Sequence, residues 1–230
     1  TRKESSAASD VYKRQDMYSP YINVIQTCFP NAKIIIDKFH LVQALHREVN
    51  RTRIQVMNQY RHKDRPLYNK FKRYWKLLLK HPKQLSRIKH KKYPLFKQWK
   101  SSYGIVAYLL DVDETLNSNH DYAHALTEAL KTGNMGRFNH LIHTSSEHPL
   151  STGMRRVLRT FKKYSPYIQN TLEYPRLTNG PLEGINNSIK TLKRVAFGYR
   201  NFAHFRDRIL LMTRLYQPQT KKESSSLYAN

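Results

Sequence analysis

Three consecutive β-branched residues, Ile34-Ile35-Ile36, most constrain the fold of this chain. They stand between a turn signal at Pro30-Asn31 and the carboxylate of Asp37, and such a run predicts a short strand buried on both faces. Apolar residues at helical spacing precede the run over 18–29 and follow it over 41–57. A helix, a buried strand and a second helix in this order are typical of an α/β fold.

The rest of the chain is predicted to be helical. Residues 58–170 form short amphipathic segments separated by prolines, helices are expected over 181–195 and 202–215, and 171–177 is expected to be extended. In the 41–57 helix the spacing predicts one inward and one outward set of side chains. The inward set is Leu41, Leu45, Val49 and Val56, and the outward set is His46, Arg47, Arg51 and Arg53.

The charge balance indicates a polyanionic partner. The 230 residues include 41 Lys and Arg against 16 Asp and Glu, a net charge of +25, and such an excess repels itself unless DNA or RNA offsets it. Residues 65–110 hold thirteen Lys and Arg, no acidic residue and several aromatics, which suits phosphate contact with base stacking but equally a helical core with a basic outer face. No apolar run approaches the roughly 18 residues that span a bilayer. A single cysteine, Cys28, excludes an internal disulfide and suits a reducing cytosol.

Three carboxylates are candidates for a metal site. Asp16 precedes a predicted helix, Asp37 ends the predicted strand and Glu183 opens a later helix, and such positions can converge at one edge of a sheet. Each also has a structural explanation, because Asp is favoured as a helix N-cap and Glu in the first helical turn. His40 is equally compatible with a packed core position.

The predicted helix of Glu183 combines a carboxylate, which can hold a hard divalent cation, with amide and cationic groups suited to phosphate. Asn186, Asn187, Lys190 and Arg194 lie on the same side. A second pattern, from His120 to His124, nearly matches the zinc-protease motif H-E-x-x-H, but Asp121 stands at the position of the general base and no third ligand is evident. A metalloprotease is therefore disfavoured.

Three blocks of sequence together resemble DDE transposases of the ISL-three insertion-sequence family. They are Asp16 to Ala32, Ile36-Asp37-Lys38-Phe39-His40-Leu41-Val42, and Asn179-Gly180-Pro181-Leu182-Glu183-Gly184-Ile185-Asn186-Asn187 with its continuation to Leu210. The resemblance implies an RNase-H-like fold with a large all-α insertion before the last catalytic helix, and a DDE site that binds two divalent ions, normally Mg²⁺. Asp16 matches the second catalytic Asp and Glu183 the final Glu, both as metal ligands. Asp37 and His40 match a supporting Asp-x-x-His motif, with Asp37 as the alternative second acid.

Composition at the two ends and the resemblance between them together predict a domain organisation. A foreign or disordered stretch over 1–15 is followed by the second half of the sheet with its flanking helices over 16–57, the α-helical insertion over 58–170, the final catalytic helix region over 171–215 and a disordered tail over 216–230. No residue upstream of Asp16 matches the first catalytic Asp, so the expectation is a truncated, inactive fragment, an α/β remnant that is predominantly helical.

The function expected from the resemblance is DNA transposition by metal-dependent phosphodiester cleavage and strand transfer. Lys190, Lys193, Arg194 and Arg200 are expected to bind phosphates of double-stranded DNA. A homo-oligomer on transposon ends and target, in the bacterial cytoplasm at the nucleoid and not at a membrane, is expected. The alternative is a non-catalytic basic helical protein that binds nucleic acid.

Overall fold

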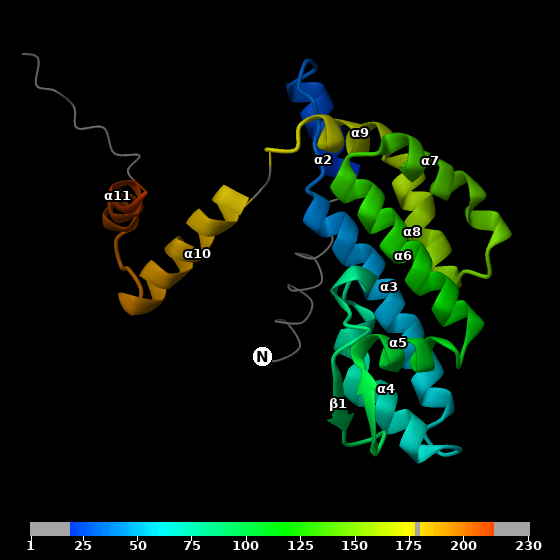
Figure 1. The fold of residues 1–230 in the computed structure, drawn as a ribbon. Helices are drawn as coiled ribbons and strands as arrows, with labels where there is room; N and C mark the ends of the chain where they lie inside the picture. The colour runs from blue at the N-terminus through cyan, green and yellow to red at the C-terminus, as the bar shows by residue number, and fades with distance from the viewer. Residues whose placement is uncertain (1–18, 178–179, 214–230) are drawn as a thin grey trace, which may run out of the picture. The chain divides into compact units, whose positions relative to one another are not determined.

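A computed structural model describes residues 19–177 and 180–213, which belong to two units, 1–177 and 178–230 (Figure 1). Each unit is described by itself. The first holds α2 (Ser19–Cys28), α3 (Lys38–Gln59), α4 (Arg65–Leu78), η2 (Pro82–Gln84), β1 (His90–Tyr93), β2 (Gln98–Ser101), α5 (Ser102–Leu110), α6 (Glu114–Thr132), α7 (Met135–His143), η3 (Thr144–Glu147), α8 (Thr152–Lys163) and α9 (Ser165–Glu173). The second holds α10 (Gly180–Val195) and α11 (Phe202–Met212). The described chain is predominantly helical, as predicted.

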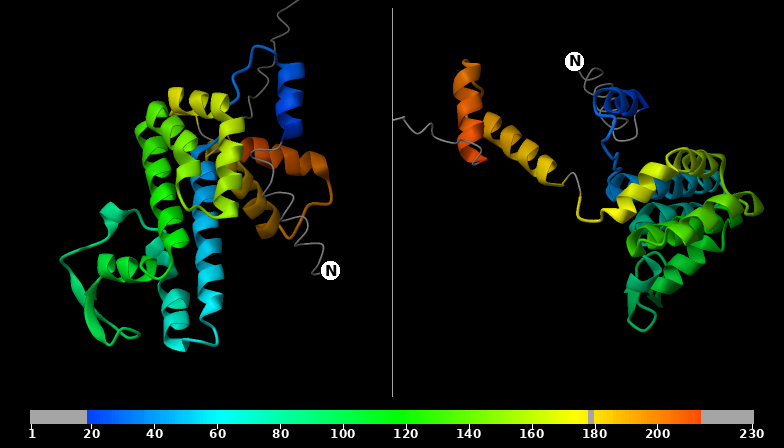
Figure 2. Two further views of the ribbon diagram at one scale, coloured as in Figure 1. Left: turned by 90° about the vertical axis from the view of Figure 1, so that its right-hand side faces the viewer. Right: turned by 90° about the horizontal axis from the view of Figure 1, so that it is seen from above.

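The core of the first unit forms around α3, which packs against α4, α6 and α8. The long helices α3 and α6 lie side by side in both Figure 1 and Figure 2. The apolar stripe predicted for α3 is confirmed, because Leu41, Leu45, Val49 and Val56 are all buried. Helical periodicity thus identified the face of α3 that packs into the hydrophobic core.

The predicted outward face of α3 is wrong at Arg53, which is buried. Its guanidinium donates to the carbonyl of Phe71 at 3.0 Å and to Asn50 Oδ1 at 2.9 Å. Burial lowers the pKa of Arg53. A charge can be buried in this way because backbone and amide oxygens replace its water. His46, also predicted outward, is half-buried.

The strand predicted at Ile34–Ile36 is wrong. No ladder forms at these residues, and the segment instead runs beside α9. Thr171 Oγ1 accepts from Ile36 N at 2.9 Å and lies 2.7 Å from Ile36 O, and Asn170 Nδ2 donates to Ile34 O at 3.0 Å. Side chains of α9 therefore form the hydrogen bonds to these backbone groups that a neighbouring strand forms in a sheet. The same helix shows that 171–177 is not wholly extended, because α9 continues to Glu173.

The sequence did not predict the two-stranded antiparallel sheet of β1 and β2. Lys92 pairs with Trp99 and Tyr93 with Gln98, and the turn between them places Lys97 at a positive φ of 54°. Figure 2 shows this hairpin projecting from the helices of its unit. The strands carry polar residues at most positions, so the apolar alternation that signals a strand is missing.

Polar side chains fix the junction of α3, α6 and α8. Asn119 on α6 is fully buried and donates to Thr52 Oγ1 and to Ser151 Oγ, both at 2.8 Å. Ser151 in turn caps α8 by accepting from Met154 N at 3.1 Å. All these buried groups are satisfied, so the network fixes how the three helices meet.

The second unit has helices where the sequence predicts them, over 180–195 and 202–212. In α10, Ile185, Ile189 and Leu192 are half-buried. Val195 and Phe202 are exposed. No helix in the described part of the chain is long and apolar enough to cross a membrane. The predictions for 1–15, for Asp16 and for 216–230 lie outside the described residues.

Candidate functional site

Asp37 caps α3. Its Oδ1 accepts from Phe39 N at 2.8 Å, and its backbone is extended, with φ −61° and ψ 129°. The capping explanation that the sequence left open is therefore realised in the structure. His40 is the third residue of the same helix, half-buried, with its ring edge-on to Phe39 at 5.3 Å between centroids. The structure thus brings Asp37 and His40 together at one helix start.

Glu183 is exposed in the first turn of α10. At 100° per residue, positions 183, 187, 190 and 194 fall on one face of a helix. Asn187, Lys190 and Arg194 are exposed there with Glu183. Lys193, on an adjacent face, and Arg200, beyond the helix, are exposed as well. The helix presents one carboxylate at its start, followed by an amide and two cations.

The predicted acids fall in different parts of the chain. Asp16 lies outside the described residues, Asp37 belongs to the first unit and Glu183 to the second. Among residues 19–177 and 180–213, no group of three or more His, Cys, Asp or Glu is arranged to hold a metal. Carboxylate oxygens such as those of Glu183 and Asp37 are the donors that Mg²⁺ prefers, so their chemistry fits the expected ion.

The β1–β2 hairpin presents a basic surface in the first unit. Lys91, Lys92 and Lys97 are exposed, and the indole of Trp99 is 69% exposed beside its cross-strand partner Lys92. An exposed tryptophan among lysines is suited to base stacking combined with phosphate contact.

Aromatic rings of the hairpin pack against α4. The Tyr74 ring contacts Tyr93 and Phe96 at centroid distances of 5.4 and 5.6 Å. Lys70 Nζ lies 4.8 Å from the centroid of Phe96 and donates to Tyr108 OH at 3.1 Å. The interpretation of this stretch as an aromatic core with a basic outer face is confirmed at Tyr74, which is buried. Trp99 is exposed, and phosphate contact with base stacking stays a prediction.

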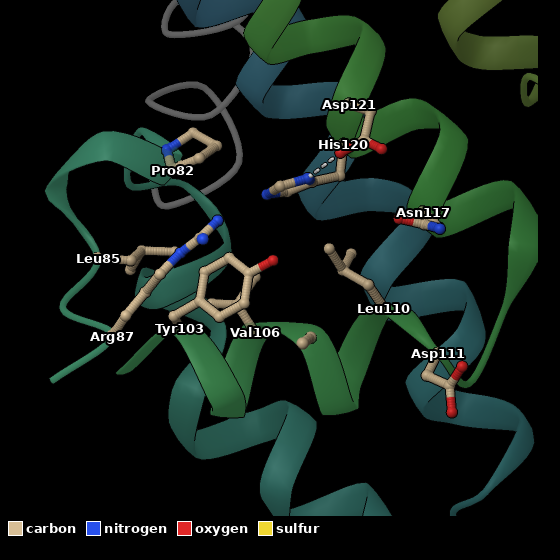
Figure 3. A pocket seen from close by; sticks show the side chains of 11 residues that line it. Pro82, Leu85, Arg87, Tyr103, Val106, Leu110, Asp111, Asn117, His120 and Asp121 are labelled. Atoms are coloured by element: carbon tan, nitrogen blue, oxygen red, sulfur yellow. Dashed lines mark hydrogen bonds and ion pairs between the residues drawn. The ribbon is translucent and has the colours of Figure 1, made fainter. Parts of the chain in front are cut away.

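A cavity of about 360 Å³ lies between η2, α5 and α6 (Figure 3). Arg87 stacks over the ring of Tyr103 at 4.3 Å on one side of it. His120, on another side, has Nδ1 3.0 Å from Asp121 Oδ1. The sequence pointed to His120 through the near-match to H-E-x-x-H, but its buried position next to the half-buried His46 required the fold.

Comparison with known proteins identifies the family of this chain. The model for DDE transposases of the ISL3 type, described as a transposase, matches residues 13–209. The transposase for insertion sequence element IS1001 of Bordetella parapertussis is 28% identical over 201 residues, 83% of this chain and 44% of that protein. A Lactococcus lactis subsp. lactis protein named ATP-dependent protease is 48% identical over 62 residues, 27% of this chain and 20% of that protein. No solved structure matches.

The class of protein follows from the family match, which covers most of the chain: the matched family is one of transposases. Within that class, the chain belongs to the ISL-three family of insertion-sequence transposases. It spans less than half the length of the curated relatives that it matches.

Proposed function

We propose that this chain supplies the closing part of the catalytic domain of a DNA transposase that cuts and joins phosphodiester bonds. The observation that carries the proposal is the α10 face, where the exposed Glu183 precedes Asn187, Lys190 and Arg194. A carboxylate next to cationic and amide groups can serve both a divalent ion and the phosphate that the ion binds. The family match extends across this helix.

In this proposal Asp16 and Glu183 are the catalytic metal ligands of an RNase-H-like site. Bound Mg²⁺ supplies activation of the attacking hydroxyl and stabilisation of the leaving oxygen. Asp37 holds the start of α3 through its cap, and His40 in the first turn of that helix supports the site beside it. Asp37 remains the alternative to Asp16 as the second acid.

Double-stranded DNA is the proposed partner, as transposon end and as target. Lys190, Lys193, Arg194 and Arg200 are exposed and carry the positive charge that phosphates require. We place flanking DNA on the basic hairpin of the first unit, and we propose a homo-oligomer, because a transposition complex handles two transposon ends.

Two other functions are less well supported. A non-catalytic nucleic-acid-binding protein explains the charge and the hairpin but gives no reason for Glu183 within a transposase family match. Proteolysis driven by ATP, suggested by the name of one relative, has only a 62-residue match behind it. The sequence also lacks the pattern G-x-x-x-x-G-K-[ST] of a P-loop.

The test is Glu183→Gln in a transposition-competent protein that contains this sequence. Removing a metal-binding carboxylate forfeits several kcal/mol of transition-state stabilisation, so strand transfer is expected to fall at least about a hundredfold. DNA binding, measured by mobility shift, is expected to persist. Glu114→Gln is the matched control, because Glu114 is an exposed acid in the first turn of α6. Equal strand transfer by the two variants would remove Glu183 from the site.

A further inference from the structure

The cavity between η2, α5 and α6 belongs wholly to the first unit and combines apolar with polar walls (Figure 3). Leu85, Val106 and Leu110 line it and are buried. The polar side chains that line it and are exposed are Arg87, Asp111, Asn117 and Asp121. Its volume of about 360 Å³ lies in the range of pockets that hold a small ligand or one group of a larger one.

One side of the cavity carries a stacked pair. The guanidinium carbon of Arg87 lies over the ring of Tyr103, 4.3 Å from its centroid. Tyr103 in α5 is 37% exposed and Arg87 is exposed as well, so the pair is open to a ligand. Aromatic rings and guanidinium planes are the groups on which proteins stack unpaired nucleic-acid bases. This side of the cavity therefore suits a flat ring.

His120 on α6 lines another side, and Figure 3 shows its ring extending from the helix toward the cavity. The residue is 3% exposed, and its Nδ1 lies 3.0 Å from Asp121 Oδ1. A carboxylate only accepts, so Nδ1 carries the hydrogen and Nε2 is left as an acceptor. Nε2 is buried and has no hydrogen-bond partner among the described residues, which is unfavourable. A ligand that brings an N–H group to this ring would supply the missing donor.

The charges around the cavity select a neutral ligand. Asp111 and Asp121 repel a free phosphate or another anion, and Arg87 repels a second guanidinium or ammonium group. A neutral ring with donors and acceptors along its edge meets neither repulsion. A nucleobase is such a ring, because its amino group donates to carboxylates while its carbonyl oxygen or ring nitrogen accepts from Arg87 or from the amide of Asn117.

The stacked pair also lies at the base of the basic hairpin. Arg87 precedes β1 by three residues, and Tyr103 follows β2 by two. Ser86 N donates to Ser102 Oγ at 2.9 Å, and Tyr103 N donates to Ser86 O at 3.2 Å, so the two ends of the hairpin are joined beside the pair. A strand whose phosphates contact the hairpin lysines would bring its bases within reach of the cavity.

We propose that this cavity binds one unpaired DNA base that carries an exocyclic amino group. The inference rests on the DNA partner proposed above. Tyr103 and Arg87 hold the base by stacking, and Asn117 and Asp111 contact its edge. A base inside a duplex is stacked and paired, so it must leave the helix to enter such a pocket, and this costs least where the base has no partner. Thymine lacks the amino group and fits less well.

The experiment measures binding of the full chain, by fluorescence anisotropy, to duplexes that differ at one position. They carry a bulged cytosine, a bulged thymine or a bulged abasic site, with the perfect duplex as reference. The cytosine bulge is expected to bind at least about fivefold more tightly than the abasic bulge, through the stacking of one base. It is also expected to bind more tightly than the thymine bulge, because cytosine N4 donates to a carboxylate.

Tyr103→Leu and Asn117→Ala are expected to remove most of the preference for the cytosine bulge, while binding to the perfect duplex stays unchanged. The matched control is Tyr108→Leu, because Tyr108 lies on the same helix with a similar exposure of 38% but does not line the cavity. This control is expected to keep the preference. If Tyr103→Leu does not fold, Arg87→Met takes its place, since Arg87 is exposed and lies outside the helices.

Equal affinity for the three bulged duplexes would overturn the proposal, and so would a preference for thymine. The same holds if Tyr108→Leu loses the preference as fully as the cavity variants do. Each of these results leaves the proposed function intact as long as the perfect duplex is bound. A chain that binds none of the duplexes would contradict the DNA partner itself, and with it both proposals.

Discussion

Single residues in this chain carry roles that depend on what surrounds them. His124 is the clearest example: burial and the neighbouring His120 lower its pKa from 6.5 to about 4. A histidine that stays neutral in the folded core contrasts with a surface histidine, which protonates in the same way before and after unfolding.

This difference predicts a pH-dependent stability. Below pH 6.5 the unfolded chain binds a proton at His124 that the folded chain takes up only near pH 4, so stability is fully present above 6.5 and falls as pH decreases through that interval. The loss attributable to His124 approaches about 3 kcal/mol. His46, whose pKa is also lowered by burial, acts in the same direction.

The measurement is urea unfolding of the protein at neutral and mildly acidic pH. His124→Asn is expected to flatten the dependence, whereas His140→Asn on the surface is expected to leave it unchanged. The same free energy of unfolding at both pH values in the unaltered chain would contradict the assignment.

For single residues, the sequence predicted the environment correctly where that environment depends on the residue's position within one helix. The buried stripe of α3 at Leu41 and Leu45 follows from periodicity, and capping by Asp37 follows from its place before a helix. Arg53 was assigned wrongly because its partner, the carbonyl of Phe71, belongs to α4. The shortfall of single-sequence reasoning therefore lies in contacts between helices.

Among the elements, the hairpin of β1 and β2 is anchored by a buried tyrosine and exposes several lysines. Tyr93 at the end of β1 is buried against Tyr74, while Lys91 and Lys92 are exposed and Trp99 extends into solvent. A two-stranded ribbon is narrow enough to enter the major groove of DNA. This combination makes the hairpin the element on which we place flanking DNA.

We expect replacement of Lys91, Lys92 and Lys97 by Gln to weaken duplex binding and to reduce the salt slope by up to about 3. Trp99→Ala is expected to cost about 1–3 kcal/mol with single-stranded DNA, through lost stacking. The control replaces Lys131, Lys162 and Lys163, exposed residues of α6 and α8, and so changes the net charge equally. If both triple variants reduce the slope alike, the hairpin is not the contact.

At the level of elements, the helices and the breaks between them were predictable. The strand predicted at Ile34–Ile36 was wrong, and the extended segment predicted over 171–177 was wrong over 171–173, which belongs to α9. Ile34–Ile36 has the composition of a strand but lies against α9, and β1 and β2 pair although their sequences are mostly polar. Whether a segment forms a strand depends on what lies beside it, and a single sequence does not contain that information.

For the whole molecule, the net charge of +25 is the dominant property. This charge was evident from the composition and indicated a polyanionic partner. The match to a transposase family agrees with that indication. The RNase-H-like arrangement and the approach of Asp16 to Glu183 stay predictions. Both concern how residues far apart in the sequence are placed in space, and helical periodicity gives no information about that placement.

The charge predicts that duplex binding by the entire chain depends steeply on salt. Lysines and arginines on DNA release counterions, so affinity is expected to fall at least about a hundredfold between about 50 and 200 mM salt. A fluorescence-anisotropy titration at several salt concentrations gives the slope. An affinity that does not change with salt would show that phosphates contribute little.

The contacts of Asn170 and Thr171 with the Ile34–Ile36 segment bear on solubility. Exposed backbone amides and carbonyls of a β-branched segment are a template on which foreign strands add, and such edges promote aggregation. In this chain the amide and carbonyl of Ile36 are already engaged by a helix hydroxyl. This β-branched stretch is thereby shielded on that side by a helix within its own unit.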